Sequence, residues 1–445
     1  MKIIFDSKGI EQSILGEQQA KAETEYRLLQ FCIIEEINGL YFLYNKMTDR
    51  VFLLTDGEYE LLSNPGAVSE ELQPFIAEWC VVPKGNDDIK LADQFIAVRE
   101  MLAEKGAITS FTILPTTDCN ARCFYCYEMG IARKNMSEQT ARDVADYIIK
   151  KSGGAEVSLK WFGGEPLFNG KAIDIICQTL SDRGVKYHSS MISNAYLFDS
   201  DTVKKAKELW NLKRVQTTLD GTADNYNRIK AYYKISDKNP FKTVTDNIER
   251  LIAEEIRVSV RLNLSDKNYD DLSSLVDWLS ERYGDKKHLT AYAALLYDLY
   301  DEDDEKLSEM LRLYISLNEK ISEKQLYPKA LPRGFKGRGC MAQNDRCVVI
   351  SPDGTLGKCE HFVEGEKTIG SIYNEAVNTD VVRYWKHQTL FDDCKKCSDY
   401  IICGRYDRCP NFRQRCDIMQ NRRNFDIRQR IISAYRVYEN DIPKK

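Results

Sequence analysis

Cysteine spacing marks the part of this sequence best suited to redox chemistry. Cys119, Cys123 and Cys126 form the pattern C-x3-C-x2-C directly after an apolar stretch at 111–114. Three thiolates this close together, on a loop that leaves a strand, can bind three irons of a four-iron four-sulfur cluster and leave the fourth iron without a protein ligand. A zinc site is the alternative, but structural zinc usually takes four Cys or His ligands from two paired clusters, and no partner pair lies nearby in the sequence.

The same stretch resembles the signature of the radical S-adenosylmethionine (SAM) enzymes. Tyr125 is the aromatic residue that this family carries before the third cysteine, and Gly-Gly-Glu-Pro follows the next expected strand. In the family, SAM binds the open iron through its amino and carboxylate groups, and electron transfer cleaves it to a 5'-deoxyadenosyl radical that abstracts a hydrogen atom. The resemblance therefore implies an enzyme that binds a [4Fe-4S] cluster and SAM and takes electrons from a flavodoxin- or ferredoxin-type donor.

The Gly-Gly-Glu-Pro segment consists of Gly163, Gly164, Glu165 and Pro166. In the family the backbone of this segment and its glutamate carboxylate hold the amino group of SAM. Glycines suit the position because only a bare backbone can approach a ligand so closely. Taken without the cysteines, the segment could equally be an ordinary turn.

Further segments resemble SAM-binding positions of the family. Ser193 and Asn194, which end the third expected strand, match the position that contacts the ribose. Thr218, which ends the fourth strand, replaces a serine of the family and keeps its hydroxyl. Lys230 stands where the family usually has an arginine that binds the cofactor carboxylate; lysine keeps the charge but loses the two-pronged geometry of arginine.

Eight more cysteines gather in the C-terminal part of the sequence. Gly354 and Cys359 form G-x4-C, and C-x2-C-x5-C begins at Cys394, a pattern that resembles the SPASM extension of radical SAM enzymes. Eight thiolates suffice for two fully ligated four-iron clusters, which makes three clusters in all. By this resemblance one auxiliary cluster takes Cys340, Cys347, Cys359 and Cys409, and the other takes Cys394, Cys397, Cys403 and Cys416.

Two features leave this ligand assignment open. Five residues separate Cys403 from Cys409, where three are usual in the family, and the position of Cys347 is not always a ligand. If Cys347 were a buried thiol, its cluster would keep an open iron that could bind a substrate thiolate. A pair of zinc-binding knuckles is the alternative for the whole region.

Glu360 directly follows Cys359 and is the candidate general base. Related enzymes that oxidise a cysteine or serine side chain carry an acid in this region, which is proposed to remove the substrate proton. A carboxylate beside a cluster and away from water can have a raised pKa and act as a base. A solvent-facing charge is the alternative for Glu360, and His361 could serve as the base instead.

The order of strands and helices explains how these segments could meet. From about residue 108 the two kinds of element alternate, which predicts a parallel sheet with right-handed crossovers. The expected strands are 109–115, 156–162, 186–193, 214–219, 257–264 and 289–295, and the expected helices begin near Ser137, Asn169, Ser200, Phe241 and Tyr269. The family resemblance makes this α/β region a partial (β/α)6 barrel, whose chemistry lies at the C-terminal ends of the strands.

Residues 1–105 are expected to form a separate, small α+β domain. Three short strands, at 29–36, 40–44 and 51–54, are followed by helical spacing at 58–62, 69–80 and 93–105. The order resembles the winged-helix-like peptide-recognition domain that precedes many peptide-modifying radical enzymes. Such a domain binds the leader segment of a precursor peptide as an added strand at its sheet edge. A structural cap without a ligand is the alternative.

Length and composition agree with a multidomain protein that acts away from membranes and nucleic acids. The 445 residues divide into expected domains at 1–105, 106–330 and 331–445, the last being the SPASM domain. A net charge of −5 argues against a nucleic-acid or anionic-membrane surface, and no apolar run approaches the roughly 18 to 20 residues that span a bilayer. The N-terminus lacks the layout of a secretory signal, so we expect a cytoplasmic protein, in whose reducing compartment cysteines bind metals or stay free.

Other residues are expected to have structural roles. Cys32 and Cys177 lie in apolar runs and should pack in the core, because a free cysteine behaves as a small hydrophobic residue. The basic stretch 422–432 has helical spacing and should form an amphipathic helix on the outside of the protein, with its arginines solvated. Contact of these arginines with an acidic peptide is the alternative.

Together these features predict a radical SAM peptide maturase. It would abstract hydrogen from a ribosomally made precursor peptide and install a thioether or carbon–carbon cross-link, which is an oxidative post-translational modification. The alternatives are a formylglycine-forming enzyme similar to anaerobic sulfatase maturases, and a non-catalytic, metal-stapled binding or electron-transfer protein. The sequence identifies neither the peptide nor the bond that is formed.

Overall fold

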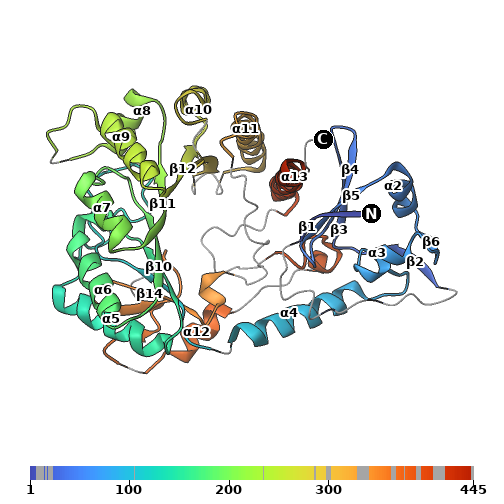
Figure 1. Cartoon of the computed structure of the whole chain (residues 1–445), viewed down its shortest axis with the longest axis horizontal. Coiled ribbons are helices and arrows are strands. Elements are labelled where there is room, and N and C mark those ends of the chain that lie inside the picture. The colour runs from blue at the N-terminus through green and yellow to red at the C-terminus, as the bar shows by residue number, and fades with distance from the viewer. Residues whose placement is uncertain are drawn as a thin grey trace.

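The computed structural model places an N-terminal unit beside a larger barrel, and helix α4 runs between them (Figure 1). The structure describes residues 1–6, 15, 18, 24–104, 106–233, 235–284, 287–296, 302–327, 340–361, 367–374, 376–386, 392–403 and 416–441. Of the expected cluster ligands, Cys409 lies outside these residues.

The barrel is built on six parallel strands that follow one another in chain order. They are β8 (Ser110–Ile113), β9 (Val157–Trp161), β10 (Tyr187–Ile192), β11 (Leu212–Thr218), β12 (Arg257–Leu264) and β13 (Leu289–Leu295). Each pairs in parallel with the next, which confirms the expected α/β architecture.

Three strands from the C-terminal region extend the same sheet. β14 (Cys347–Ile350) pairs in parallel with β8, and β15 (Thr355–Gly357) and β16 (Gly370–Ser371) follow in antiparallel pairing. The chain thus returns to the first barrel strand, β8, after more than 200 residues. The strand that precedes the C-x3-C-x2-C loop is therefore paired with a strand from the C-terminal region.

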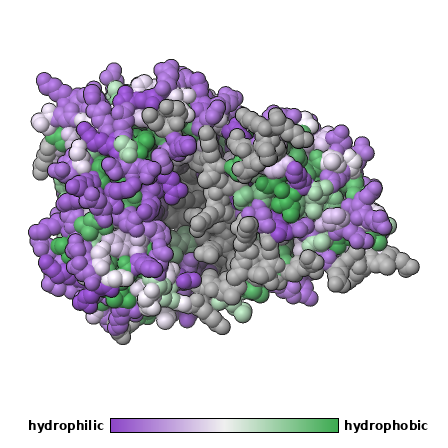
Figure 2. Space-filling view, viewed as in Figure 1, coloured by the Kyte–Doolittle hydropathy of each residue, from purple (hydrophilic) through white to green (hydrophobic). Residues whose placement is uncertain are grey.

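Helices cover the outer face of the barrel sheet (Figure 1), and the side that they present is largely hydrophilic (Figure 2). They are α5 (Glu138–Ser152), α6 (Gly170–Asp182), α7 (Ser200–Glu208), α8 (Ala223–Lys230), α9 (Pro240–Ala253), α10 (Tyr269–Tyr283) and α11 (Asp304–Glu323). The first begins and ends as expected, because Ser137 accepts a hydrogen bond from the Thr140 amide and Gly153 ends the helix with a φ of 58°.

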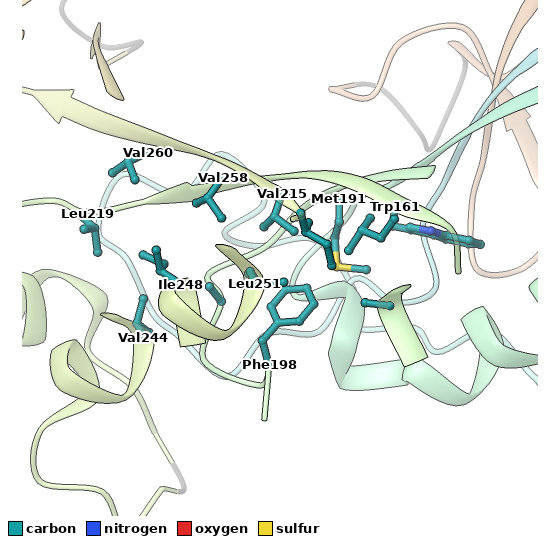
Figure 3. Packing of buried hydrophobic residues seen from close by; sticks show 14 of the residues in the cluster. Trp161, Met191, Phe198, Val215, Leu219, Val244, Ile248, Leu251, Val258 and Val260 are labelled. Carbon is teal, nitrogen blue, oxygen red and sulfur yellow. The ribbon is translucent and has the colours of Figure 1, made fainter. Parts of the chain in front are cut away.

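Side chains alternate between the two faces of each barrel strand, and this alternation positions the site. Val215 and Val258 point outward and pack against Ile248 and Leu251 of α9 (Figure 3). Residues of the same strand an odd number of positions away, such as Thr218, three residues after Val215, therefore lie on the inner face. On β9 the same alternation buries its apolar residues against the helices and turns Lys160 inward.

The described residues of the N-terminal unit form two antiparallel sheets and three helices. One sheet has the order β1 (Lys2–Asp6), β5 (Arg50–Leu54), β4 (Leu40–Asn45), β3 (Cys32–Ile37), and the other has the order β6 (Gly66–Ala67), β2 (Glu25–Leu28), β7 (Val81–Pro83). The helices are α2 (Asp56–Ser63), α3 (Gln73–Ala77) and α4 (Asp88–Glu104). β3, β4 and β5 are the three expected strands; the other four were not predicted.

The C-terminal helix α13 (Cys416–Asp441) packs on the N-terminal sheet. Its Ile427 and Ile431 join a buried cluster with Phe42 and Val51 of that sheet. Arg430 is only 4% exposed and donates to both carboxylate oxygens of Asp49, at 2.5 and 2.6 Å. The prediction that the arginines of this helix are solvated is therefore wrong for Arg430, because a buried carboxylate pairs with it.

Shorter elements complete the described structure. They are η1 (Pro166–Asn169), η3 (Met341–Gln343), α12 (Thr379–Lys386) and η5 (Asp392–Lys396). Cys32 and Cys177 are buried, as expected. Within the described part of the chain, none of the helices has the length and apolar character needed to cross a membrane.

Candidate active site

The C-x3-C-x2-C loop follows β8 and is held in place by hydroxyl groups at its start. Thr116 Oγ1 accepts a hydrogen bond from the Asp118 amide at 2.9 Å, and Thr117 Oγ1 donates to the Ala132 carbonyl at 2.7 Å. β8 thereby fixes where the loop begins, and the residues that follow the cysteines fold back across it.

The three thiols of this loop share one site. Burial, together with negative charge on Glu165, Cys123 and Cys126, raises the pKa of the Cys119 thiol to about 12. Iron binds the thiolate rather than the thiol, so cluster assembly at this loop releases protons. The amide of Ala121 already donates to Cys119 Sγ at 3.3 Å, which favours the thiolate.

The two glycines at the end of β9 let the next loop lie against the cysteine loop. A Cβ on Gly164 would stand 2.1 Å from the Asp118 carbonyl oxygen, and one on Gly163 would stand 2.5 Å from the Thr116 carbonyl oxygen. Gly163 also has a φ of 88°, a conformation that favours glycine. In this structure the backbone that requires these glycines is that of the cysteine loop.

Glu165 is fully buried and gathers the expected SAM-binding residues around it. Its Oε1 accepts from Ser193 Oγ at 2.8 Å and its Oε2 accepts from the Asn194 amide at 2.8 Å. Asn194 Nδ2 in turn donates to Asn120 Oδ1 in the cysteine loop at 2.7 Å. Burial raises the pKa of Glu165 to about 7, although these donors lower it. The ends of β9 and β10 thus meet the cysteine loop, and Pro166 continues from Glu165 into η1.

Lys230 lies on the other side of the loop in a buried polar network. Its Nζ is 3.0 Å from Asp220 Oδ2 and donates to the Tyr125 hydroxyl at 3.2 Å. The Tyr125 hydroxyl donates to Asp220 Oδ2 at 2.7 Å, and Asn263 Nδ2 donates to the other oxygen at 3.1 Å. Burial opposes the charge of Lys230, but Asp220, Tyr125 and Cys123 outweigh it and raise its pKa. A cation therefore lies beside the cysteine loop.

Thr218 is half-buried at the end of β11, and its strand partner in register is Arg261 of β12. Both lie beside the residues just described because the C-terminal ends of parallel strands share one edge of the sheet.

A second polar group faces the barrel interior, and we call its four residues the inner polar group: Glu128, Lys160, Glu360 and His361. Glu360 Oε2 is 2.5 Å from Lys160 Nζ, and the Glu360 side chain is 19% exposed, so it does not face open solvent. Burial and the charge of Glu360 raise the pKa of Glu128 to about 7. Burial lowers the pKa of His361, whose ring lies 4.5 Å from the Tyr127 ring between centroids.

Two members of the inner polar group, Glu128 and Lys160, were not predicted. Lys160 had a usable signal, because it is a charged residue within the otherwise apolar strand β9. Glu128 had none, because it lies in the loop after Cys126 and its burial depends on the C-terminal region that brings Glu360.

The described cysteines expected for one auxiliary cluster lie near one another, and we call Cys340, Cys347 and Cys359 the first auxiliary group. Cys359 packs against Cys340, and Cys347 begins β14 in register with Ser110 of β8. Lys358 Nζ donates to the Cys347 carbonyl at 2.9 Å.

The four cysteines expected for the other cluster also lie together, and we call Cys394, Cys397, Cys403 and Cys416 the second auxiliary group. The Cys397 amide donates to the Cys394 carbonyl at 3.0 Å. Burial raises the pKa of Cys416, Arg423 lowers it, and negative charge on Cys403, Cys394 and Cys397 raises it further.

The residues of the cysteine loop fit an iron–sulfur cluster and SAM. The donor set is three thiols beside a cation, and the buried carboxylate of Glu165 lies next to them. Asn120 Nδ2 is buried there and is without a hydrogen-bond partner in the structure. Among the described side chains, no three His, Cys, Asp or Glu residues are placed to hold a single metal ion.

Comparison with known proteins finds similar radical SAM proteins. Residues 113–279 match the model of the Radical SAM superfamily. The chain is 21% identical over 315 residues to the serine-type anaerobic sulfatase-maturating enzyme of Klebsiella aerogenes. The aligned region covers 64% of this chain and 76% of that protein. It is 23% identical over 301 residues to the radical SAM cyclopropyl synthase TigE of Paramaledivibacter caminithermalis. This aligned region covers 57% of this chain and 63% of that protein.

Solved structures share the fold. Native anSMEcpe with bound AdoMet superposes with a TM-score of 0.57 at 16% identity, over 74% of this chain and 99% of that chain. Streptococcus suis SuiB bound to precursor peptide SuiA superposes with a TM-score of 0.50 at 14% identity, over 87% of this chain and 98% of that chain.

Proposed function

We propose that the chain, whose residues 113–279 match the Radical SAM superfamily model, is a radical SAM peptide maturase. It would abstract hydrogen from a carbon of a ribosomally made precursor peptide and install a thioether or carbon–carbon cross-link. One observation carries the proposal. The same chain has the candidate radical SAM site and an N-terminal sheet in which β3 is an edge strand, as far as the described residues show. An edge strand can accept a leader peptide through main-chain hydrogen bonds.

The likeness to SuiB supports a role for this N-terminal unit. SuiB covers 87% of the chain, and one of its structures holds precursor peptide SuiA. Beside β3, Arg428 of α13 lies 3.4 Å from Glu35 Oε2 and donates to the Glu36 carbonyl at 3.5 Å. A bound leader would therefore lie next to a cationic side chain.

The site residues have separate roles in holding the cofactor. Cys119, Cys123 and Cys126 would bind three irons, and SAM on the fourth would supply hydrogen abstraction by a one-electron route. Glu165 would hold the amino group of SAM, and its contacts with Ser193 and Asn194 keep its carboxylate oriented toward the loop. The network of Lys230, Asp220 and Tyr125 keeps a positive charge where the cofactor carboxylate would bind.

The inner polar group would act on the substrate. Forming the cross-link removes two hydrogens, the first as an atom and the second as a proton and an electron. Glu360 would accept the proton, and Lys160, whose Nζ lies 2.5 Å from Glu360 Oε2, would hold the carboxylate in place. The two auxiliary groups of cysteines would hold the clusters toward which the electron leaves.

A formylglycine-forming maturase is the second candidate. The relationship to the sulfatase-maturating enzyme of Klebsiella aerogenes and the fold shared with anSMEcpe favour it. anSMEcpe covers 74% of this chain, whereas SuiB covers 87%, so the second candidate leaves more of the chain without a role.

The experiment that tests the function combines metal analysis with cofactor cleavage. The wild type and a Cys119/Cys123/Cys126 triple alanine variant are reconstituted anaerobically, and iron, sulfide and 5'-deoxyadenosine are measured after dithionite reduction. We expect about twelve irons in the wild type and about eight in the variant, because each cubane holds four. Only the wild type should release deoxyadenosine. Zinc in place of iron, or iron without cleavage, would contradict the proposal.

The peptide is tested separately. Precursors encoded beside the gene are incubated with the reconstituted enzyme and followed by mass spectrometry. Loss of two hydrogens from a peptide supports a cross-linking maturase. Conversion of a cysteine or serine in a sulfatase-derived peptide to formylglycine would support the second candidate instead.

A further inference from the structure

The loop that carries the second auxiliary group packs inside the N-terminal unit. Tyr400 and Ile401 are 3% and 4% exposed and belong to the same buried cluster as Phe31 and Phe75 of that unit. The hydroxyl of Tyr400 donates to Asp93 Oδ1 of α4 at 2.5 Å. The loop therefore supplies part of the core of a unit that lies about 300 residues earlier in the chain.

Polar side chains of the N-terminal unit hold this loop at the cysteines themselves. Gln30 Nε2 donates to the Lys395 carbonyl at 3.1 Å and to the Cys397 carbonyl at 3.0 Å. Lys46 Nζ is 2.6 Å from Asp399 Oδ1, and the two side chains are 1% and 0% exposed. Lys46 Nζ also donates to Ser398 Oγ at 3.1 Å.

Asp399 connects these contacts to the thiols. Its amide donates to Cys397 Sγ at 3.4 Å, and its carbonyl accepts from the Cys403 amide at 2.8 Å. Its second carboxylate oxygen accepts from Arg423 Nε at 2.6 Å, and Arg423 Nη2 donates to the Cys416 carbonyl at 3.1 Å. Asp399 thus contacts Cys397 and Cys403 through its backbone, and its buried carboxylate is linked to Cys416 through Arg423.

The charges explain why this carboxylate can lie beside thiolates. A buried carboxylate next to thiolates is repelled unless cations neutralise it. Lys46 and Arg423 supply two such cations, one from the N-terminal unit and one from α13. Removing Lys46 would leave Asp399 undercompensated and free to shift, and it would also remove positive charge from the neighbourhood of the thiols.

We infer that the N-terminal unit is a structural part of the second auxiliary group's site, with Lys46 as the positioning residue that orients its thiolates through Asp399. The inference rests on the proposed function, because it takes these cysteines as cluster ligands. It follows that a peptide bound by the N-terminal unit and a cluster bound by the second auxiliary group share one packed body. Net charge and hydrogen bonds near a cluster set its reduction potential, so Lys46 also raises that potential.

The test compares Lys46→Met and Lys46→Arg in the full-length, anaerobically reconstituted protein. Lys84→Met is the matched control, because Lys84 also belongs to the N-terminal unit but pairs with Glu25 on its surface. Iron per chain, the electron paramagnetic resonance spectrum and midpoint potentials are measured. We expect Lys46→Met either to lose about four irons or to keep them with a more negative midpoint for one auxiliary cluster. Lys46→Arg should restore the midpoint toward the wild-type value, and Lys84→Met should leave it unchanged.

Two further measurements keep the outcome clear. Deoxyadenosine release reports on the radical SAM site in the same samples, so a Lys46→Met protein that retains it has not lost its overall fold. Gln30→Leu, which removes only the contacts to two loop carbonyls, should shift the midpoint without loss of iron. Lys46→Met with full iron, an unchanged spectrum and an unchanged midpoint would overturn the inference. Only about four irons in the wild type would instead overturn the proposed function.

Discussion

At the scale of single residues, Glu165 is the side chain on which cofactor binding should depend most. Replacing it by glutamine keeps its shape and removes the charge that would face the SAM amino group. A hydrogen bond to a charged group is worth about 1.5 to 3 kcal/mol, so Glu165→Gln should weaken SAM binding roughly 10- to 100-fold. Equilibrium binding of SAM to the reconstituted protein measures this, and Glu156→Gln is the control because Glu156 pairs with exposed His188. Equal affinity in Glu165→Gln and the wild type would contradict the assignment.

The pKa of Glu165 gives this binding a pH dependence. Burial raises that pKa to about 7, so the carboxylate is half protonated near neutral pH and the protonated fraction grows as the pH falls. Because the charged carboxylate accepts a hydrogen bond from the SAM amino group more strongly than the protonated one does, affinity should rise between about pH 6 and pH 8. This dependence should be lost in Glu165→Gln. Titration of SAM at several pH values checks the prediction. A wild-type affinity that is flat across this range would show that Glu165 does not titrate there.

Glu360 belongs to the substrate step rather than to the cofactor step. Glu360→Gln should leave deoxyadenosine release in place and lower formation of the cross-linked peptide by about 10²- to 10⁴-fold, which is the usual contribution of a general base. Deoxyadenosine and peptide product are measured in the same reaction. Glu302, an exposed carboxylate near Lys306, offers a matched Glu→Gln control. Equal loss of both products in Glu360→Gln would place its role in cofactor binding.

At the scale of elements, the packing of helix α13 on the N-terminal sheet should depend on one buried ion pair remaining complete, that of Arg430 with Asp49. Removing one partner of such a pair costs about 3 to 5 kcal/mol, because the other charge stays buried without compensation. Arg430→Met should therefore lower the unfolding temperature, whereas Arg383→Met should not, since Arg383 and Asp380 form an exposed pair. Anaerobic thermal unfolding measures both variants. An unchanged unfolding temperature in Arg430→Met would show that the apolar contacts of α13 suffice.

The elements that local sequence could predict are those whose partners follow directly along the chain. The six parallel strands alternate with helices, and each pairs with its neighbour in sequence, so pattern and connection rules were enough. β14 was not predicted as a barrel strand because its partner β8 lies more than 200 residues away. The burial of Arg430 was missed for the same reason, since its helical spacing carries no sign of Asp49.

In the candidate site, too, contacts between consecutive strands could be predicted, whereas contacts between distant segments could not. The barrel rule correctly brought Glu165, Ser193 and Asn194 together at the ends of their strands. The network around Lys230 and Tyr125 and the pairing of Lys160 with Glu360 depend on side-chain directions across distant segments, which spacing alone does not specify.

At the scale of the whole molecule, the C-terminal region divides its contacts between two bodies. The segment with Cys347 extends the barrel sheet, whereas the loop with Cys397 and helix α13 pack in the N-terminal unit. The two auxiliary groups of cysteines therefore belong to different packed bodies of one chain. A displacement between those bodies would change the separation of the groups without distorting either one.

The contact between α13 and the N-terminal sheet also has a consequence for biosynthesis. The sheet leaves the ribosome before residues 427–434, which cover its apolar face and follow its last strand by more than 370 residues. At about 5 to 20 residues per second, that face waits roughly 20 to 80 seconds for its cover. During this time a nascent chain exposes apolar side chains and an open strand edge, so chaperone demand in the cell should depend on how fast the intervening part of the message is translated.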